Sequence, residues 1–248
     1  MYRSLKNFVV RLVPRKLLFE QEENFRSLYS VFYSGKKFQC TICKKNLKKF
    51  IKTTHSDLLC PNCGSLQRNR RLWDLLETEF LKPNSVILDF SPSRCLYRKL
   101  KKISNINYQS TDLSGDFIAD NQFDITNLKI ANETFDLILC YHILEHIQED
   151  ITAMKEVFRV MKTGGKALVQ TPFKEGEIYE DHTIISKEER VKHFGQEDHI
   201  RIYSAQGLKE RLRNCGFQVE IRNNFIDKNK FGFNKNETIL VLTKPLNL

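Results

Sequence analysis

The sequence has 248 residues, of which 41% are hydrophobic and 28% are charged, and its formal net charge is +10. This composition excludes collagen, low-complexity disorder and a small disulfide scaffold, and the length suits one large domain or a medium domain with a small companion. No apolar run approaches the ~18 residues that a membrane-spanning helix needs. The basic start of the chain is interrupted by Arg11 and Pro14 and lacks a small-residue cleavage site. We therefore expect no secretory signal and a cytoplasmic protein.

The positive charge is concentrated at one end of the sequence. Residues 1–82 hold 17 Lys and Arg against 7 Asp and Glu, whereas the remaining residues are balanced. A basic segment of this kind can bind nucleic acid, an anionic membrane face or an acidic partner, or it can be a solvated lysine-rich surface. We divide the chain into a basic amphipathic helical segment (1–36), a cysteine-containing module with its linking helix (37–82) and a neutral domain (83–248).

The first segment carries two apolar stripes at the spacing of one helical face. One stripe consists of Leu5, Phe8, Val9 and Leu12, and the other of Phe25, Leu28, Tyr29 and Phe32. We expect this segment to pack on its own domain. The alternative is peripheral contact with a membrane surface, on which basic amphipathic helices can lie.

Four of the seven cysteines form two C-x2-C pairs, Cys40 with Cys43 and Cys60 with Cys63. The distance between the pairs matches that of tetrahedral zinc sites. Gly64 suits a tight turn after the second pair, and the basic surroundings help to keep four thiolates deprotonated. Two disulfides or a redox C-x-x-C are the alternatives, and the odd cysteine count argues against disulfides. We predict that all four cysteines bind one structural zinc ion.

Apolar strands and amphipathic helices alternate through the rest of the chain, after a helix over 66–80 that ends before Pro83. Strands are expected at 86–90, 107–112, 135–140, 167–170, 217–221 and 238–242. Helices are expected at 94–102, 149–162 and 204–215, the second of which is stopped by Gly164 and Gly165. Residues 173–203 match neither period and are expected to be an insertion over the site. The alternation predicts an α/β fold with a Rossmann-like, doubly wound, mostly parallel sheet.

Acidic residues end the first two expected strands of this sheet. Ligands of such sheets bind at the carboxyl ends of the strands, where Asp112 could accept hydrogen bonds from ribose hydroxyls. The first turn, Asp89-Phe-Ser-Pro-Ser93, lacks the glycines that let backbone approach a pyrophosphate. Their absence argues against NAD, FAD or ATP and allows a nucleoside cofactor without phosphates. The alternative is that both acids cap nearby backbone amides.

Five segments of the chain match the sequence motifs of a known family. They are Ile87–Ser93, Tyr108–Asp112, Phe123–Ile125, Phe135–His146 and Val160–Lys166. Together they resemble the class I S-adenosylmethionine-dependent methyltransferases, specifically the methyltransferase type 11 group. The later HFGQEDHIRIYS and GLKERLRNCGF resemble a subgroup with an N-terminal four-cysteine zinc ribbon. The resemblance covers roughly residues 40–243. The D-x-G-x-G-x-G of the family is D-F-S-P-S-R-C in this chain.

The resemblance implies that S-adenosylmethionine is the cofactor, and it assigns candidate contacts. The first turn would meet the methionine part, Asp112 the ribose and Asp124 the adenine, while the end of the strand expected at 135–140 would face the sulfonium. The implied cofactor-binding residues are Asp89, Phe90, Ser91, Ser93, Asp112, Leu113, Asp124, Ile125, Cys140 and Tyr141.

An alcohol acceptor also needs a base, because its proton must leave as the new bond forms. His142 is the first candidate for this catalytic role and His199 the second. The residues expected to contact substrate are His146, Asp181, His182, Glu197, Asp198 and Arg201. A surface salt-bridge cluster is the alternative for these. The H-x-x-E-H of residues 142–146 also matches a zinc protease motif, but that motif needs an established helix, and His142 directly follows a strand.

The sequence leaves three functions open. A small-molecule or carbohydrate-like hydroxyl acceptor fits the neutral domain. It also fits the absence of an Asn-Pro-Pro-aromatic signature at the end of the strand expected at 135–140. An RNA acceptor fits the basic zinc ribbon, where residues 68–71 (Arg-Asn-Arg-Arg) could hold phosphates. The third function is a catalytically inactive, zinc-stapled binding module.

Overall fold

The computed structural model describes residues 15–54, 56–225 and 229–246. These residues form two compact units, the first containing those up to Thr78 together with 229–234, and the second containing the rest. The return of 229–234 to the first unit was not predicted. The stripe from Leu5 to Leu12 lies outside the described residues. No helix in the described part combines the length and the apolar character of a membrane span.

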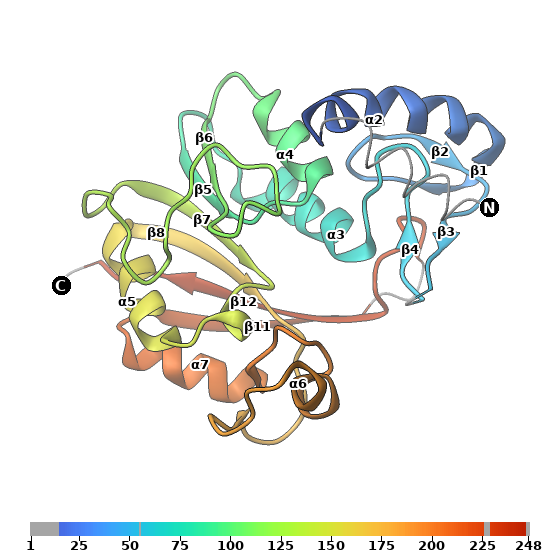
Figure 1. Ribbon diagram of the computed structural model, residues 1–248. Helices are drawn as coiled ribbons and strands as arrows, with labels where there is room; N and C mark the ends of the chain where they lie inside the picture. The colour runs from blue at the N-terminus through green and yellow to red at the C-terminus, as the bar shows by residue number, and fades with distance from the viewer. Residues whose placement is uncertain (1–14, 55, 226–228, 247–248) are drawn as a thin grey trace. The chain divides into compact units, whose positions relative to one another are not determined.

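The described part of the first unit contains two α-helices and four short strands (Figure 1). Helix α2 (Arg15–Ser30) leads through a 3-10 turn (Val31–Tyr33) into β1 (Ser34–Gln39), which pairs antiparallel with β2 (Asn46–Leu47). Strand β3 (Ile51–Lys52) pairs antiparallel with β4 (Leu58–Leu59), and α3 (Gln67–Leu75) follows. The chain then continues through a π-helical turn (Leu76–Phe80), so the predicted helix over 66–80 is present.

Arg70 of α3 is buried at the centre of the first unit. Its guanidinium donates to the backbone carbonyls of Ser65, Phe231 and Gly232 and lies 4.0 Å from the ring centroid of Phe50. These bonds attach residues 229–234 to the unit. The prediction that Arg70 could hold a phosphate is wrong, because its side chain is enclosed and already hydrogen-bonded.

The apolar stripe of α2 faces outward from its own unit. The side chains of Phe25, Leu28 and Phe32 are about 70% exposed. The polar side of the helix packs instead, since the Ser30 hydroxyl donates to the Asn62 side-chain oxygen at 3.0 Å. The expectation that this stripe packs on its own domain is therefore wrong.

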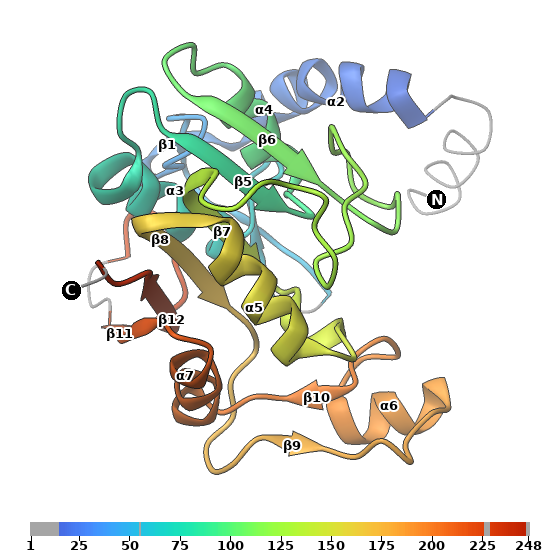
Figure 2. The same cartoon turned by 90° about the vertical axis from the view of Figure 1, so that its left-hand side faces the viewer.

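The second unit contains a six-stranded sheet in the order β11–β12–β8–β7–β5–β6. Its parallel strands are β5 (Val86–Phe90), β6 (Asn107–Thr111), β7 (Phe135–Tyr141) and β8 (Met161–Gln170), and its antiparallel edge consists of β12 (Asn236–Thr243) and β11 (Gln218–Phe225). The chain builds outward from β5 in both directions, so right-handed crossovers put α4 (Arg94–Lys101) and α5 (Asp150–Val160) on opposite faces (Figure 2). The predicted doubly wound, mostly parallel sheet is confirmed.

The core lies mainly between the sheet and two helices, α5 and α7 (Ala205–Asn214). Met154 and Val157 of α5 and Leu208 and Leu212 of α7 are buried against apolar strand residues. Burial on both faces explains why these strands read as near-continuous apolar runs in the sequence.

Gly164 and Gly165 lie inside β8 rather than at the end of a helix. Helix α5 ends at Val160, because Met161 has an extended backbone and begins the strand. The pairing of β8 with β7 then shifts register, and a Cβ on Gly165 would lie 2.7 Å from the Lys162 carbonyl oxygen. The prediction that these glycines stop the helix is wrong. They permit a strand irregularity that a side chain would obstruct.

The segment 173–203 contains regular structure, contrary to the prediction. It holds β9 (Tyr179–Glu180), α6 (Lys187–Phe194) and β10 (Arg201–Ile202), with β9 and β10 antiparallel. The Ser186 hydroxyl accepts the Glu189 N–H at the start of α6, and Gly195, with φ of +86°, ends it. A serine before a helix and a glycine after it are common capping residues, so the sequence itself contains the signal for α6.

Candidate functional site

The carboxyl ends of β5, β6 and β7 form the edge where the crevice was predicted. Strand β5 lies between the other two, so the strand order reverses beside it. Asp89 is near the end of β5, Asp112 directly follows β6, and Cys140 is near the end of β7. Burial and the nearby carboxylates of Glu145 and Asp89 raise the pKa of the Cys140 thiol. Groups from β5, β7 and the loop after β7 are therefore close to one another.

The turn after β5 contains a left-handed residue although it has no glycine. Ser91 has a φ of +46°, in the region that glycine adopts without strain. Its backbone N–H donates to the Thr111 carbonyl, and its hydroxyl donates to Oδ1 of Asp112 at 2.7 Å. Ser93 precedes α4 as its N-terminal cap residue. The turn thus joins the ends of β5 and β6.

Asp112 is the most heavily hydrogen-bonded of the predicted cofactor residues. Besides the Ser91 hydroxyl, it accepts the Ser114 hydroxyl at 2.9 Å and the Phe117 N–H at 3.2 Å. Burial acts to raise its pKa, but these hydrogen bonds hold the pKa of Asp112 below its ordinary value. The adjacent Leu113 is exposed. The carboxylate is therefore fixed directly after β6, and its hydrogen bonds favour the ionised form.

Asp89 is enclosed within the sheet. Its carboxyl accepts the Tyr108 hydroxyl of β6 at 2.9 Å, and its neighbour Phe90 is also buried. Burial raises the pKa of Asp89 to about 7, although the hydrogen bond from Tyr108 opposes this rise. These contacts support a role for Asp89 in joining β5 to β6, and its cofactor contact stays a prediction.

No strand forms at residues 123–125, and an isolated bridge between Thr111 and Asn121 lies at the end of β6. Asp124 is exposed, and its Oδ1 accepts the backbone N–H and the hydroxyl of Thr126. Ile125 is buried in the core of the second unit. The adenine contact of this pair stays a prediction.

His142 and Glu145 form a pair at the carboxyl end of β7. His142 has a φ of +56°, and its Nδ1 lies 3.3 Å from Oε1 of Glu145. Its Nε2 is buried and has no hydrogen-bond partner within the described ranges. Burial acts to raise the pKa of Glu145, but the His142 imidazole holds that pKa below its ordinary value. Glu145 was not among the predicted site residues, although its place in H-x-x-E-H was a signal.

The segment 173–203 brings a further imidazole to this carboxylate. The Ile200 N–H donates to the Glu145 carbonyl, so residues next to it in the chain are held beside the loop after β7. The rings of His146 and His199 are 4.7 Å apart and nearly perpendicular. His142 and His199, the two predicted catalytic residues, are therefore both neighbours of Glu145.

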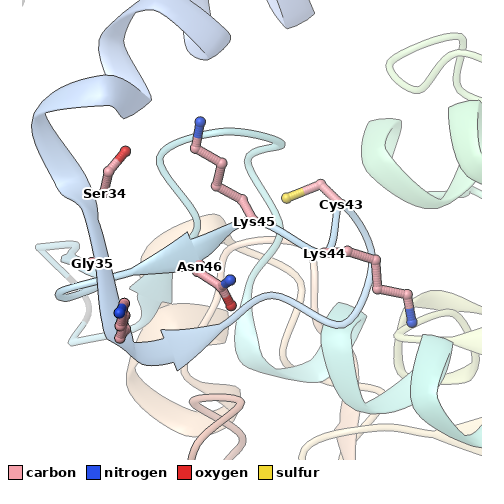
Figure 3. Close-up of a pocket in the computed structure, with 7 residues that line it drawn as sticks. Ser34, Gly35, Cys43, Lys44, Lys45 and Asn46 are labelled. Atoms are coloured by element: carbon pink, nitrogen blue, oxygen red, sulfur yellow. The ribbon is translucent and has the colours of Figure 1, made fainter.

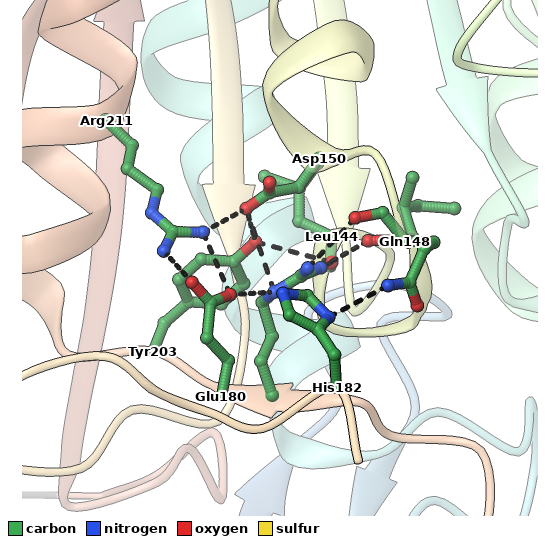
Figure 4. Close-up of polar contacts among 9 residues, drawn as sticks. Leu144, Gln148, Asp150, Glu180, His182, Tyr203 and Arg211 are labelled. Atoms are coloured by element: carbon green, nitrogen blue, oxygen red, sulfur yellow. Dashed lines mark hydrogen bonds and ion pairs between the residues drawn. The ribbon is translucent and has the colours of Figure 1, made fainter. Parts of the chain in front are cut away.

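Arg201 forms ion pairs with Asp150 and Glu180, which also pair with Arg211. Asp150, Glu180 and Arg211 are labelled in Figure 4. The Arg201 side chain is 2% exposed. Its acceptors are the carbonyl oxygens of Leu144, Ile147 and Gln148 and the carboxylate of Glu180. The bonds to these carbonyls fix the loop that carries Glu145 and His146. They support a positioning role for Arg201 rather than the predicted contact with substrate.

The other residues predicted to contact substrate have partners within the second unit. The Gln148 amide donates to Nδ1 of His182 at 3.0 Å (Figure 4). Asp181 accepts the N–H and the hydroxyl of Thr183, Glu197 lies 3.4 Å from Lys187, and Asp198 contacts His146. Their contacts with substrate stay predictions.

The four cysteines of the first unit converge on one centre. Their sulfurs lie within 4.8 Å of one another, with Cys40 and Cys63 at 3.6 Å and Cys43 and Cys60 at 3.8 Å. Zinc–sulfur bonds of ~2.3 Å at tetrahedral angles place sulfurs about 3.8 Å apart. The cysteines are not disulfide-bonded. The donor set therefore fits a zinc ion whose four ligands all come from protein, which is a structural site.

A groove of about 620 Å³ lies beside Cys43 (Figure 3). Lys36, Lys44 and Lys45 line it. Lys44 is paired with Glu77 at 2.5 Å, while the other two lysines have no ion-pair partner in the described chain. The groove is therefore a positively charged surface of the first unit.

A family model described as a methyltransferase domain matches residues 66–220, more than half of the chain. The chain belongs to the methyltransferase domain family. One solved structure with a similar fold is the complex between the Haloferax volcanii Trm112 methyltransferase activator and a methyltransferase (13% identity, TM-score 0.50, 70% of this chain and 88% of that chain). Another is Haemonchus contortus phosphoethanolamine N-methyltransferase 2 in complex with S-adenosylmethionine (14% identity, TM-score 0.52, 72% of this chain and 53% of that chain). At these identities the likeness shows the fold alone.

One curated relative, an uncharacterised protein of Methanocaldococcus jannaschii, is 33% identical over 85 residues. The match covers 33% of this chain and 37% of the relative. The chain thus spans little more than a third of the length of that protein.

The donors around Asp112 show how this methyltransferase domain fits its family's cofactor, S-adenosylmethionine. The Ser91 hydroxyl donates to one carboxylate oxygen and the Ser114 hydroxyl to the other. The ribose diol of the cofactor offers the same pair of O–H donors. We propose that Asp112 holds the ribose, whose two hydroxyls would replace those of Ser91 and Ser114 as donors to the carboxylate.

Replacing Asp112 with alanine is expected to weaken S-adenosylmethionine binding by about 10- to 100-fold, as expected for losing hydrogen bonds to a charged group. Isothermal titration calorimetry measures this. Asp116→Ala removes an exposed carboxylate from the same loop and should leave the affinity unchanged. Equal affinity in the Asp112 variant and the parent protein would refute the ribose assignment, and no heat from the parent would favour the inactive module.

Asp89→Asn is expected to stabilise the protein at alkaline pH. Since the pKa of Asp89 is about 7 when folded and about 4 when unfolded, the folded state binds more protons between these values. The contribution of protonated Asp89 to the free energy of unfolding is therefore complete below about pH 4, and it is lost as the pH rises through about 7. Asparagine still accepts the Tyr108 hydroxyl but does not ionise. Urea unfolding at about pH 8 should show a gain of up to about 4 kcal/mol, and a gain equally large at about pH 4 would contradict this account.

Cys60→Ser is expected to abolish zinc binding and to loosen the first unit, because three thiolates and a hydroxyl hold zinc poorly. Elemental analysis of the purified protein should fall from one zinc per chain to near zero. Cys215→Ser, which changes a cysteine of the second unit, is the matched control. Unchanged zinc content in the Cys60 variant would show that the four cysteines are not the zinc site.

Proposed function

We propose that this chain transfers a methyl group from S-adenosylmethionine to a hydroxyl of a small-molecule or carbohydrate-like acceptor. The observation that supports this proposal is the pair formed by His142 and Glu145. The imidazole directly follows β7, where the family binds the sulfonium, and its Nε2 is buried without a hydrogen-bond partner in the described chain. An alcohol acceptor needs a base at this place, whereas an acceptor that is already nucleophilic does not.

Different residues of this chain would accept the proton, position the loop and bind the cofactor during methyl transfer. When bound, the cofactor supplies an electrophilic methyl group on its sulfonium. His142 accepts the proton of the acceptor hydroxyl at Nε2, while Glu145 contacts Nδ1, orients the ring and stabilises the imidazolium that forms. Arg201 holds the loop in place through its bonds to backbone carbonyls. Asp112 fixes the cofactor so that the methyl group and the acceptor oxygen are aligned.

The residues at the carboxyl end of β7 also favour oxygen over an exocyclic base amine. Methyltransferases of base amines resemble one another in an Asn-Pro-Pro-aromatic motif at this place, which reads Cys140-Tyr-His in this chain. The Cys140 side chain is buried and has no amide to accept an amine proton. A hydroxyl acceptor therefore suits these groups better.

An RNA acceptor is the second candidate. The groove lined by Lys36, Lys44 and Lys45 could hold phosphates, and the exposed rings of Phe25 and Phe32 could stack on bases. In this case the protein should bind RNA in a filter assay, and the affinity should fall steeply as salt rises. The absence of binding at low salt would remove this candidate.

His142→Asn is expected to slow methyl transfer by about 100- to 10,000-fold, the usual contribution of a general base. The acceptor is first found by incubating the enzyme with cofactor carrying a tritiated methyl group and with separated metabolite, glycan and RNA fractions. The rate is then measured with the fraction that takes label, and cofactor affinity by calorimetry should be unchanged. His193→Asn changes a histidine outside the pair and serves as the control.

Label that enters only RNA, label on nitrogen, or an undiminished rate in the His142 variant would each contradict the proposed function.

A further inference from the structure

We propose that Glu145, His146 and His199 bind a divalent transition-metal ion, at a site separate from the four cysteines. One ligand atom from each of the three residues lies within 4.8 Å of the other two. Glu145 and His146 belong to the 3-10 turn after β7 (Leu144–His146), and His199 comes from the segment before β10. The hydrogen bond from the Ile200 N–H to the Glu145 carbonyl holds the two segments together.

The burial of the Glu145 carboxylate is the first observation that supports a bound cation. It is 1% exposed, and neither of its oxygens has a hydrogen-bond partner in the described chain. Nδ1 of His142 lies 3.3 Å from Oε1. A buried carboxylate without hydrogen bonds is costly, and carboxylates in such places are commonly paired or bound to metal. One cation at the second oxygen would compensate the charge while His142 keeps its contact.

The two imidazoles are oriented as metal ligands usually are. Nδ1 of His146 lies 3.2 Å from the Asp198 carbonyl oxygen and 3.4 Å from its carboxylate, and Nδ1 of His199 lies 3.3 Å from the Phe194 carbonyl oxygen. Each Nδ1–H can donate to its carbonyl, which leaves the lone pair on Nε2 for a cation. Metal-bound histidines almost always use the other ring nitrogen in this way.

The donor set indicates which ions fit. Two imidazoles and one carboxylate suit manganese, iron or zinc better than calcium or magnesium, which prefer oxygen ligands throughout. Three protein ligands also leave coordination positions open, as in catalytic rather than structural sites. If the proposed hydroxyl acceptor is correct, on which this step rests, a cation beside His142 would lower the pKa of that hydroxyl. His142 would then remove a proton that is already weakened.

The test uses the full-length protein with its four-cysteine zinc left in place and Mn²⁺ as the probe, because thiolates bind Mn²⁺ weakly. Electron paramagnetic resonance measures free Mn²⁺, and we expect one additional ion to be bound per chain. Nitrogen modulation in the pulsed spectrum should report the histidine ligands. Glu145→Gln and His146→Asn should abolish binding, and His193→Asn should not.

Asp198→Ala guards against variants that misfold, because this side chain is exposed and touches the proposed ion only through His146. Binding should weaken by less than about 10-fold, because the Asp198 backbone carbonyl remains to accept the Nδ1–H of His146. Circular dichroism and cofactor calorimetry confirm that each variant is folded.

No Mn²⁺ binding by the parent protein, or equal binding by a folded His146→Asn variant, would overturn the metal site. Mn²⁺ binding without methyl transfer to any hydroxyl would leave the metal site standing and would refute the proposed function instead.

Discussion

The Glu145 carboxylate sits almost fully out of water at the end of β7, and the arrangement of the site follows from that burial. An ionised carboxylate in such a place is costly unless positive groups or hydrogen bonds surround it. His142 contacts it directly, and His146 and His199 lie next to it. The histidines that lie beside this carboxylate are thus also the groups proposed to accept a proton and to bind a metal ion.

The positions of these groups also depend on a buried arginine outside the cluster. Arg201 is buried, and its bonds to the carbonyls of Leu144 and Gln148 fix the loop in which Glu145 lies. A buried guanidinium needs carboxylate partners of its own, and Glu180 supplies one at 2.9 Å. Hydrogen bonds from Arg211 and Arg201 in turn lower the pKa of Glu180 to about 2, against the effect of its partial burial. The Glu180 carboxylate therefore stays ionised near neutral pH.

The sequence predicted the sheet well, because buried parallel strands are short apolar runs separated by helices. Strands β5, β6 and β7 fall within a residue of their predicted bounds. Helix α5 was extended too far, since its apolar pattern continues into Met161, and only the pairing with β7 decides that this residue is extended. The spacing of apolar residues shows which residues are buried. Where a buried helix runs directly into a buried strand, as at Val160 and Met161, this spacing does not show where one ends and the other begins.

The predicted site residues divide along a similar line. Asp112 and His142 could be found because a strand precedes each of them and the ends of parallel strands meet. The neighbourhood of His146 and His199 could not, because it depends on a bond between Ile200 and Glu145 across more than fifty residues. Arg201 carries a charge that sequence reasoning assigns to a surface, and only its buried acceptors show that it holds backbone.

The turn after β5 shows how a family pattern can be lost while its geometry is kept. Where the family has glycine, Ser91 adopts a left-handed backbone, which costs of order 1–3 kcal/mol for a residue with a side chain. Its hydroxyl donates to the Asp112 carboxylate, and hydrogen bonds to charged groups contribute about 1.5–3 kcal/mol. The two effects are similar in size, so the serine can hold the turn that glycine forms without strain. Because the compensating bond is made to the carboxylate expected to bind ribose, the conformation of the turn and the occupancy of Asp112 are coupled. A ligand that displaces the Ser91 hydroxyl must itself supply a donor, which a ribose diol does and an apolar molecule does not.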